Sequence, residues 1–255
     1  MRILAVIPAR FSSSRLPGKP LELIGAKPMI QHVYEQVKKA KKIFDVVVAT
    51  DDERIVQAIT GIGGKAQLTN SNHLSGTDRV IEIMKHFPDA DGIINIQGDE
   101  PFIEPEEIEL VAKILIEKGS SYPLAATLVK KLVDPKKLEN PSIIKVVVSS
   151  EGKAIYFSRS PIPFIRDHSN RNDWPLKHPF WQHIGIYGYN IKALQQISQM
   201  PPSLLEKAES LEQLRWIENE IPIFTAETKG ANFSVDTPED LEQARIHYKK
   251  SNNER

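Results

Sequence analysis

The feature that most restricts the fold of this chain is a repeated order of short apolar runs and longer helical patterns along its first half. The apolar runs cover residues 3–7, 46–50 and 92–97, and the helical patterns cover residues 29–40, 53–60, 76–86 and 105–117. Strands that are apolar almost throughout are typical of a parallel sheet covered by helices on both faces. We therefore predict an α/β fold of three layers with a mostly parallel sheet.

The second half of the chain follows a different pattern. Strand-like runs lie at 124–129, 143–148, 154–157 and 184–189, followed by a helical pattern at 204–220, a short run at 222–226 and a last helix from residue 238. Successive strands without helices between them indicate an antiparallel or mixed extension of the sheet. No Gly/Ser linker or repeat interrupts the chain, so we predict one domain over residues 1–255 with an inserted arm at about residues 155–190.

Composition excludes several classes of function. Lys and Arg number 33 and Asp and Glu number 33, a formal net charge of +0 that gives no overall field for binding nucleic acid. The absence of cysteine excludes disulfides, thiolate nucleophiles and Cys-ligated metals, and it fits a reducing compartment. The first apolar run ends at Pro8, and no apolar run approaches the roughly 18 residues of a membrane span. We expect a cytoplasmic protein without a membrane partner.

The loop after the first strand carries a clear signal for a ligand. Ligands of parallel α/β sheets bind beyond the carboxyl ends of the strands. Residues 8–20 combine three cations, three hydroxyls and a glycine, which suit a triphosphate. The glycine spacing fits neither a Walker A loop nor a G-x-G-x-x-G fingerprint. Arg10, Ser13 and Lys19 are therefore nucleotide-binding candidates, and a loop kept soluble by its cations is the less favoured alternative.

A second segment, residues 75–79, precedes the helical pattern at 76–86. Small residues and an arginine at the start of a helix can contact a base or a phosphate through backbone amides and the guanidinium. Ser75 and Arg79 are candidates for such contacts. An ordinary helix N-cap is the alternative, and the segment taken alone favours the cap.

Two aspartates are candidate ligands for Mg²⁺. Asp99 follows an apolar strand, on the ligand side of the sheet, where a carboxylate suits a hard cation, and an ordinary turn aspartate is an equal alternative. Near the C-terminus, Thr237 and Asp240 match a capping box with Pro238 at the first helical position. The cap leaves Asp236 free to act as a second carboxylate for the same metal.

The chain resembles the family of 3-deoxy-manno-octulosonate cytidylyltransferases, or CMP-Kdo synthetases, in segments spread over nearly its whole length. In chain order the segments are IPAR (7–10), RLPGKP (15–20), ATD (49–51), SGTDR (75–79), QGDEP (97–101), YFSR (156–159), HIGIYGY (183–189), LEQLR (211–215) and VDTPED (235–240). The family usually has Glu where this chain has Asp78. The resemblance implies a Rossmann-like nucleotidyltransferase fold and a homodimer in which the inserted arm contributes to the interface and to sugar binding.

The resemblance also implies an enzyme that joins CTP and the acid sugar Kdo to give CMP-Kdo and pyrophosphate for lipopolysaccharide biosynthesis. Asp99 and Asp236 would bind Mg²⁺, and Lys19 and Arg10 would balance the charge of the triphosphate. Gln97, with Ser75 and Arg79, would lie near cytosine and ribose. The residues implied to contact the sugar are Arg159, His183, Tyr187, Glu212 and Gln213. For His183, a structural histidine on a strand is the alternative.

Three other functions remain open. The sugar acceptor can be 8-amino-3,8-dideoxy-manno-octulosonate, because the quoted residues do not discriminate it from Kdo. A sialic acid cytidylyltransferase shares variants of the first loop, but LPGK (16–19) and HIGIYGY (183–189) favour Kdo. An inactive nucleotide-binding regulator would have no need for Lys19 and both aspartates.

Overall fold

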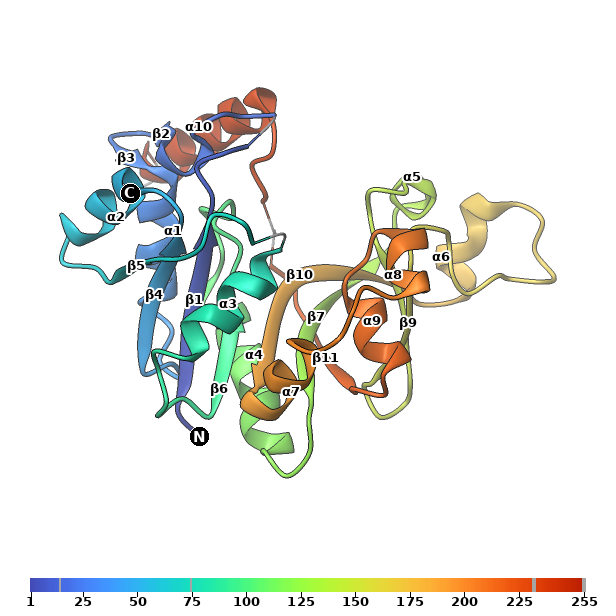
Figure 1. Cartoon of the computed structure of the whole chain (residues 1–255). Coiled ribbons are helices and arrows are strands. Elements are labelled where there is room, and N and C mark those ends of the chain that lie inside the picture. The colour runs from blue at the N-terminus through green and yellow to red at the C-terminus, as the bar shows by residue number, and fades with distance from the viewer. Residues whose placement is uncertain (14, 74, 231–232, 254–255) are drawn as a thin grey trace. The chain divides into compact units, whose positions relative to one another are not determined.

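Contacts within the chain divide it into two units. The computed structural model describes residues 1–13, 15–73, 75–230 and 233–253 (Figure 1). Unit 1 comprises Met1–Ala112 and Gly230–Arg255, and unit 2 comprises Lys113–Lys229. The single domain expected from the sequence stays a prediction, and its arm at about residues 155–190 lies inside unit 2.

Unit 1 contains a parallel sheet with the strand order β6-β1-β4-β5. The strands are β1 (Ile3–Ala9), β4 (Asp45–Thr50), β5 (Ala66–Leu68) and β6 (Gly92–Asn95). In register, Val6 of β1 pairs with Val47 on one side and with Asn95 on the other. The side chains of β1 are buried from Ile3 to Ile7, so the predicted apolar strands form the middle of the sheet.

Helices cover both faces of this sheet. The helices of unit 1 are α1 (Met29–Val37), α2 (Glu53–Thr60), α3 (Gly76–Met84) and α10 (Pro238–Asn253), with the short elements η1 (Lys19–Leu21), β2 (Leu23–Ile24) and β3 (Lys27–Pro28), and α4 (Pro105–Lys118) begins in unit 1 and ends in unit 2. Right-handed crossovers place α1 and α2 on one face. α3 lies on the opposite face, because the connection from β5 to β6 runs back across the sheet to the other side of β1 (Figure 1). The predicted three-layer arrangement is confirmed.

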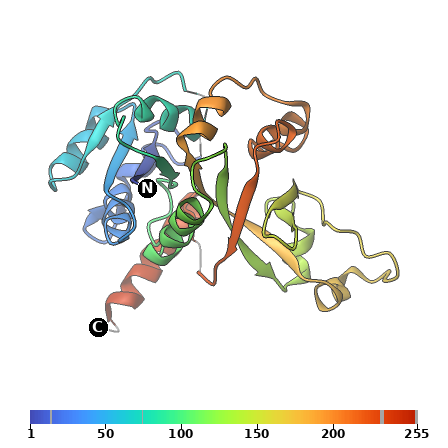
Figure 2. The same ribbon diagram turned by 90° about the horizontal axis from the view of Figure 1, so that it is seen from below.

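Unit 2 is mixed, as the second half of the sequence predicted. Its strands are β7 (Ala125–Leu132), β8 (Lys145–Val148), β9 (Ala154–Ser158), β10 (Phe180–Asn190) and β11 (Ile223–Glu227). β10 runs antiparallel to β7 and β8, β9 runs antiparallel to β8, and β11 runs parallel to β7 (Figure 2). The helices are α5 (Pro135–Glu139), η2 (Arg171–Asp173), α6 (Trp174–Lys177), α7 (Ile191–Ile197), α8 (Leu204–Glu209) and α9 (Gln213–Glu218).

The prediction of one continuous helix at 204–220 is wrong, because the segment forms two helices. A capping box between Ser203 and Glu206 starts α8. Ser210 then adopts a left-handed conformation (φ 51°) that ends this helix, and the chain becomes helical again at Gln213.

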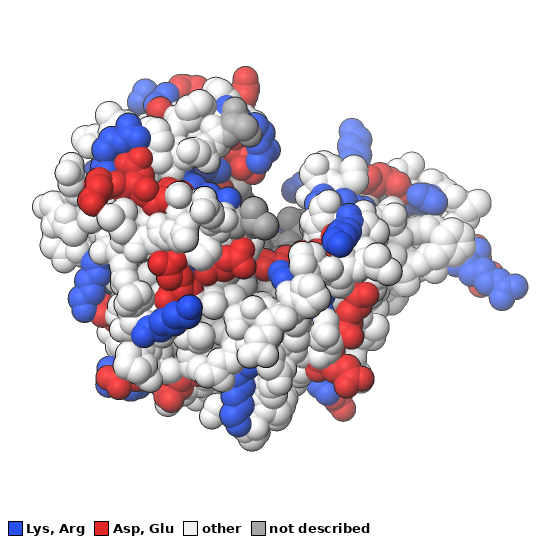
Figure 3. All heavy atoms as spheres, in the orientation of Figure 1, with Lys and Arg blue, Asp and Glu red and all other residues white. Residues whose placement is uncertain are grey.

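The surface agrees with the balanced composition. Acidic and basic side chains are interspersed on the face of each unit that Figure 3 shows. Across the described ranges, no helix has both the length and the apolar character needed to span a membrane.

Candidate active site

A pocket of about 400 Å³ lies in unit 1 at the carboxyl ends of β1 and β6. The loop after β1, the start of α3, the loop after β6 and the segment before α10 line it. Its walls contain these residues predicted from the sequence: Arg10, Ser13, Lys19, Ser75, Gln97, Asp99 and Asp236. Ser14 lies outside the described residues. A second cavity of about 370 Å³, beside α1 and α10, contains Lys27, His32 and His247 and none of the predicted site residues.

The loop after β1 is closed by its own backbone. Gly18 donates a hydrogen bond from its N–H to the carbonyl of Phe11 (3.1 Å), and its φ of 69° is a left-handed conformation that suits glycine. Leu16 turns into the interior, where its side chain is 8% exposed. Lys19 follows as the first residue of η1. The bond between Gly18 and Phe11 and the burial of Leu16 therefore place Lys19 at the pocket wall.

Asp99 and Asp236 converge on Lys19, although more than a hundred residues separate them in sequence. The ammonium Nζ of Lys19 lies 2.6 Å from Asp99 Oδ2 and 3.2 Å from Asp236 Oδ1. Arg15 Nη2 lies 3.0 Å from the same oxygen of Asp236. Two carboxylates thus share the Lys19 ammonium at the edge of the pocket, and Asp236 also faces Arg15.

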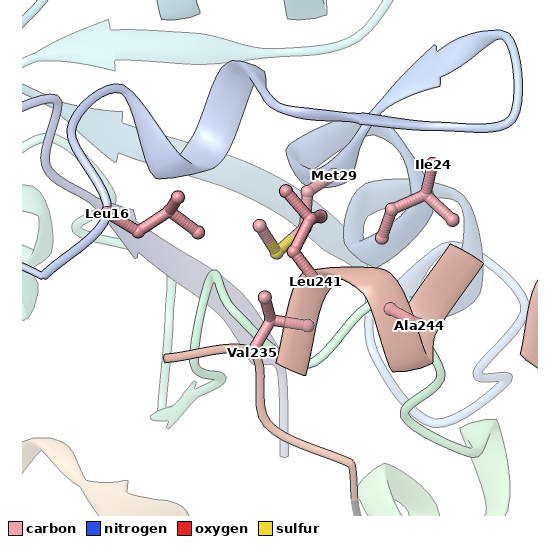
Figure 4. Close-up of a cluster of buried hydrophobic side chains, with 6 residues drawn as sticks. All are labelled: Leu16, Ile24, Met29, Val235, Leu241 and Ala244. Carbon is pink, nitrogen blue, oxygen red and sulfur yellow. The ribbon is translucent and has the colours of Figure 1, made fainter. Parts of the chain in front are cut away.

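Packing explains why the two aspartates meet. The N–H of Val235 donates to the carbonyl of Asp99 (2.9 Å), which joins the segment before α10 to the loop after β6. Val235 is fully buried and packs in a cluster with Leu16 (Figure 4). The other members of the cluster are Ile24, Met29, Leu241 and Ala244. Burial of these apolar side chains fixes the backbone on either side of the pocket.

The capping box predicted at the start of the last helix is present. Thr237 Oγ1 accepts from the N–H of Asp240 (3.2 Å), and Asp240 Oδ2 accepts from the N–H of Thr237 (2.9 Å). Asp240 also accepts from the N–H of Asp236 (3.0 Å). The Asp236 carboxylate is therefore not needed for the cap and faces Lys19.

The loop after β6 passes close to the backbone of β1. A Cβ atom on Gly98 would lie 2.7 Å from the carbonyl oxygen of Pro8, so the approach of the two segments requires glycine. Glu100, two residues after Gly98, is buried. Burial together with the negative charges of Asp99 and Glu107 raises the pKa of the Glu100 carboxyl to about 8. At neutral pH, Glu100 is therefore mostly uncharged, and the negative charge at this edge comes from Asp99 and Asp236.

The donor set at this edge suits Mg²⁺. Asp99 and Asp236 offer carboxylate oxygens around the position that the Lys19 ammonium reaches. In the described part of the chain, no cluster of three or more His, Asp or Glu side chains could hold a metal alone. Mg²⁺ commonly takes one or two protein carboxylates and completes its shell with water and substrate phosphates. The residues present therefore fit a metal that arrives with a nucleotide.

The SGTDR segment forms a helix cap, which is the alternative that the segment alone favoured. Ser75 Oγ accepts from the N–H of Asp78 (3.0 Å), and Asp78 Oδ2 accepts from the N–H of Ser75 (2.9 Å). Asp78, in the position where the family usually has Glu, thus closes a capping box at the start of α3. Ser75 still lines the pocket.

Arg79 is not among the residues that line the pocket, and its predicted contact with the nucleotide stays a prediction. Its side chain is fully buried, and its guanidinium contacts Asp51 Oδ2 (3.1 Å) and Thr69 Oγ1. The guanidinium is therefore bonded inside unit 1. Asp51 is named in the sequence analysis without a functional role. Its position directly after β4, at the ligand end of the sheet, indicates such a role.

The sugar-binding candidates all lie in unit 2. Arg159 donates to the carbonyls of Glu209 (2.6 Å), Pro141 (3.0 Å) and Ser210 (3.3 Å), so its guanidinium joins the segment at 209–210 to the backbone at Pro141. Glu212 accepts from Arg215 (2.8 Å), and Gln213 is buried at the start of α9. These contacts position the residues, and their contact with a sugar stays a prediction.

His183 and Tyr187 lie together on β10. Their rings are 5.1 Å apart, and the His183 ring also packs edge-on against Phe157 (5.2 Å). His183 Nε2 lies 3.0 Å from the hydroxyl of Thr127. The Tyr187 hydroxyl is buried without a hydrogen-bond partner among the described residues, and burial raises its pKa well above the ordinary value. An unsatisfied buried hydroxyl of this kind is a group that a polar ligand can satisfy.

His183 predicts a pH dependence of stability. Burial lowers its pKa from 6.5 to about 3, so the ring stays neutral in the folded chain while the unfolded chain takes up a proton below pH 6.5. The contribution of the neutral His183 ring to the free energy of unfolding is complete above pH 6.5 and is lost as the pH falls toward 3. Between pH 6 and 4, the free energy of unfolding of the wild type should fall relative to that of His183→Gln by up to about 1.4 kcal/mol per pH unit.

Denaturant unfolding at several pH values measures this difference. His178→Gln is the matched control, because His178 is exposed in the same unit and its replacement should leave the slope unchanged. Equal slopes for the wild type and His183→Gln would show that His183 does not stay neutral in the folded chain.

Comparisons with known proteins agree with this geometry. The sequence matches the cytidylyltransferase family over residues 4–229. It is 50% identical over 240 residues, 94% of each chain, to a 3-deoxy-manno-octulosonate cytidylyltransferase of Cytophaga hutchinsonii. It is 45% identical over 249 residues, 96% of this chain and 97% of the other, to the protein of the same name from Parabacteroides distasonis. A solved structure of CMP:2-keto-3-deoxy-manno-octonic acid synthetase complexed with CTP is similar with a TM-score of 0.90 and 44% identity, covering 98% of this chain and 100% of that chain.

Proposed function

The chain belongs to the cytidylyltransferase family, and from this premise we propose that it transfers CMP from CTP to the anomeric hydroxyl of Kdo and releases pyrophosphate. The product, CMP-Kdo, is the activated sugar for lipopolysaccharide biosynthesis. The observation that carries the proposal is the convergence of Lys19, Asp99 and Asp236 at the pocket edge. Relatives named for this activity match nearly the whole chain.

The reaction is a displacement at phosphorus. The anomeric hydroxyl of Kdo loses its proton to solvent and its oxygen attacks the α-phosphorus of CTP, the bond from that phosphorus to the bridging oxygen breaks, and pyrophosphate leaves with the electron pair of that bond. The charge spreads over phosphoryl oxygens, so the protein contributes by positioning and by electrostatic stabilisation. We propose that Lys19 and Arg10 balance the charge of the triphosphate and of the leaving pyrophosphate, with Ser13 as a hydroxyl donor to the same groups. Both cations and Ser13 line the pocket.

We propose that Asp99 and Asp236 hold Mg²⁺. When bound, the metal would lower the pKa of the sugar hydroxyl and neutralise charge on the α-phosphate. The support is the pair of carboxylates that already face one cation. Gln97 and Ser75 line the same pocket, and we propose that they contact cytosine and ribose.

For the sugar we propose contacts in unit 2 from Arg159, His183, Tyr187, Glu212 and Gln213. The carboxylate of Kdo needs a cation, and its hydroxyls need polar partners. The buried hydroxyl of Tyr187, without a partner among the described residues, supports this role most directly. The support for His183 is weaker, because its ring packs as a structural histidine would.

A pyrophosphate-release assay tests the function. Each of the four nucleoside triphosphates is combined with Mg²⁺ and with Kdo, its 8-amino analogue or N-acetylneuraminate. We expect turnover with CTP and Kdo alone. A site built to bond one group discriminates strongly against its replacement, so kcat/KM separates the two octulosonates. Preference for either other sugar would change the substrate assignment, and CTP binding without pyrophosphate release would identify an inactive regulator.

We also propose that the protein is a cytoplasmic homodimer that joins through the arm of unit 2. The support for the dimer is that apolar side chains of the arm are exposed, namely Ile155 (54% exposed), Phe164 (68%) and Leu176 (82%). An interface over the arm would remove this apolar surface from water, which favours association. The lack of cysteine fits the reducing cytoplasm.

Light scattering tests the dimer. Phe164→Ser together with Leu176→Asp should convert a dimeric wild type into a monomer. Leu204→Asp is the control, because Leu204 is also 82% exposed in unit 2 but lies on α8 and outside the arm. A wild type that is monomeric at micromolar concentration, or a double variant that stays dimeric, would refute the arm as the interface.

A further inference from the structure

A buried ion pair lies behind the loop that lines the nucleotide pocket. Arg79 on α3 is 0% exposed, and its Nη2 lies 3.1 Å from Oδ2 of Asp51, whose side chain is 14% exposed. Arg79 Nη1 also donates to the hydroxyl of Thr69. The other oxygen of Asp51, Oδ1, accepts from the N–H of Phe11 (3.3 Å). One carboxylate thus joins the buried arginine to the backbone of the loop after β1.

Phe11 is the residue at which this loop is fixed. Its carbonyl accepts the N–H of Gly18 (3.1 Å), which closes residues 11–18. The guanidinium of Arg54, at the start of α2, lies 3.5 Å from the centre of the Phe11 ring. Gly18 packs against the same ring, since a Cβ atom there would lie 3.3 Å from two ring carbons. Asp51, Arg54 and Gly18 therefore hold Phe11 by its N–H, its ring and its carbonyl.

We propose that Asp51 and Arg79 are positioning residues for nucleotide binding, which act by fixing Phe11 and with it the pocket loop. This inference rests on the proposed function. Arg10 precedes Phe11 directly, Ser13 lies within the closed loop and Lys19 directly follows Gly18, so an error at Phe11 is passed on to all of them. Arg79 acts through Asp51 and does not itself touch the nucleotide.

Burial makes the ion pair between Asp51 and Arg79 rigid enough to fix Phe11. A desolvated arginine that loses its carboxylate partner leaves an uncompensated charge, so the native arrangement is strongly preferred over alternatives. A preformed loop does not lose backbone entropy when the triphosphate binds, and this saving appears as affinity for CTP. The sugar candidates lie in unit 2 and make none of these contacts, so their affinity for Kdo should be independent of the pair.

The experiment compares CTP affinity and sugar KM in variants of the full chain. Isothermal titration gives the Kd for CTP with Mg²⁺, and steady-state assays at saturating CTP give the KM for Kdo. For Asp51→Ala we expect CTP affinity to fall about tenfold, the equivalent of one lost charged hydrogen bond, while the KM for Kdo changes less than about twofold. Asp51→Asn keeps an oxygen that can accept from Phe11, so it should recover part of the loss.

A second pair of variants keeps the test decisive if Asp51→Ala fails to fold. Arg54→Ala removes the exposed guanidinium over Phe11 and should weaken CTP binding about threefold. Arg2→Ala is its control, because Arg2 lies over the ring of Phe44 (4.5 Å), next to the opposite end of β1, and CTP affinity should not change. Unchanged CTP affinity in folded Asp51→Ala or in Arg54→Ala, or a rise in the KM for Kdo as large as the rise in the Kd for CTP, would overturn the inference. A wild type that neither binds CTP nor releases pyrophosphate would instead refute the proposed function.

Discussion

Replacement of Asp99 or Asp236 by asparagine should lower kcat at least about a hundredfold and leave the fold intact, because each change removes a charge that the reaction needs. Asparagine keeps the size of the side chain but offers a neutral oxygen in place of a carboxylate. Both side chains are partly exposed, 23% for Asp99 and 39% for Asp236, so their ion pairs with Lys19 contribute little to folding. The kcat for pyrophosphate release and the thermal unfolding midpoint measure the two effects separately.

Asp89→Asn is the matched control, because Asp89 is exposed elsewhere in unit 1. It should retain the wild-type kcat and midpoint. The Mg²⁺ concentration at half-maximal rate gives a further readout, which we expect to rise in Asp99→Asn and Asp236→Asn and to stay unchanged in the control. Wild-type kcat in either site variant would remove that carboxylate from the proposed metal site.

The sequence predicted the parallel half of the fold well because its strands and helices have different periods. β1, β4, α2 and α3 begin within one residue of their predicted starts. β5 was missed because it is three residues long and none of its side chains is buried, so no apolar run marks it. The break between α8 and α9 was also missed, because a left-handed serine at position 210 has no sequence signature comparable to glycine.

The candidate site was predictable where chemistry and position in the fold coincide. Asp99 directly follows a strand at its ligand end, and the capping box left the side chain of Asp236 unassigned, so both were identified without knowledge of their distance. The partner of Arg79 was not predictable in this way. Asp51 lies 28 residues away in sequence, and no local pattern distinguishes a guanidinium that faces a pocket from one that faces a buried carboxylate.

The second large effect is expected for Lys19→Met, which removes the ammonium and keeps most of the aliphatic length. The Lys19 side chain is 15% exposed, and its ammonium contacts the carboxylates of both Asp99 and Asp236. We expect kcat/KM for CTP to fall by roughly two orders of magnitude, because the variant loses a desolvated cation that faces the triphosphate. Lys42→Met, at an exposed position of the same unit, should match the wild type in the same assay.

The same variant also tests whether the two aspartates form a cation site. In the wild type, Lys19 and Arg15 together balance the charges of Asp99 and Asp236, so Mg²⁺ without nucleotide should raise the thermal midpoint only slightly. In Lys19→Met only Arg15 faces the two carboxylates, and Mg²⁺ should raise the thermal midpoint more than in the wild type by binding between them. Lys19→Arg should show the small wild-type response, because its charge is retained. An equal response to Mg²⁺ in Lys19→Met and Lys19→Arg would mean that the metal binds elsewhere, and the convergence of the two aspartates would then serve Lys19 alone.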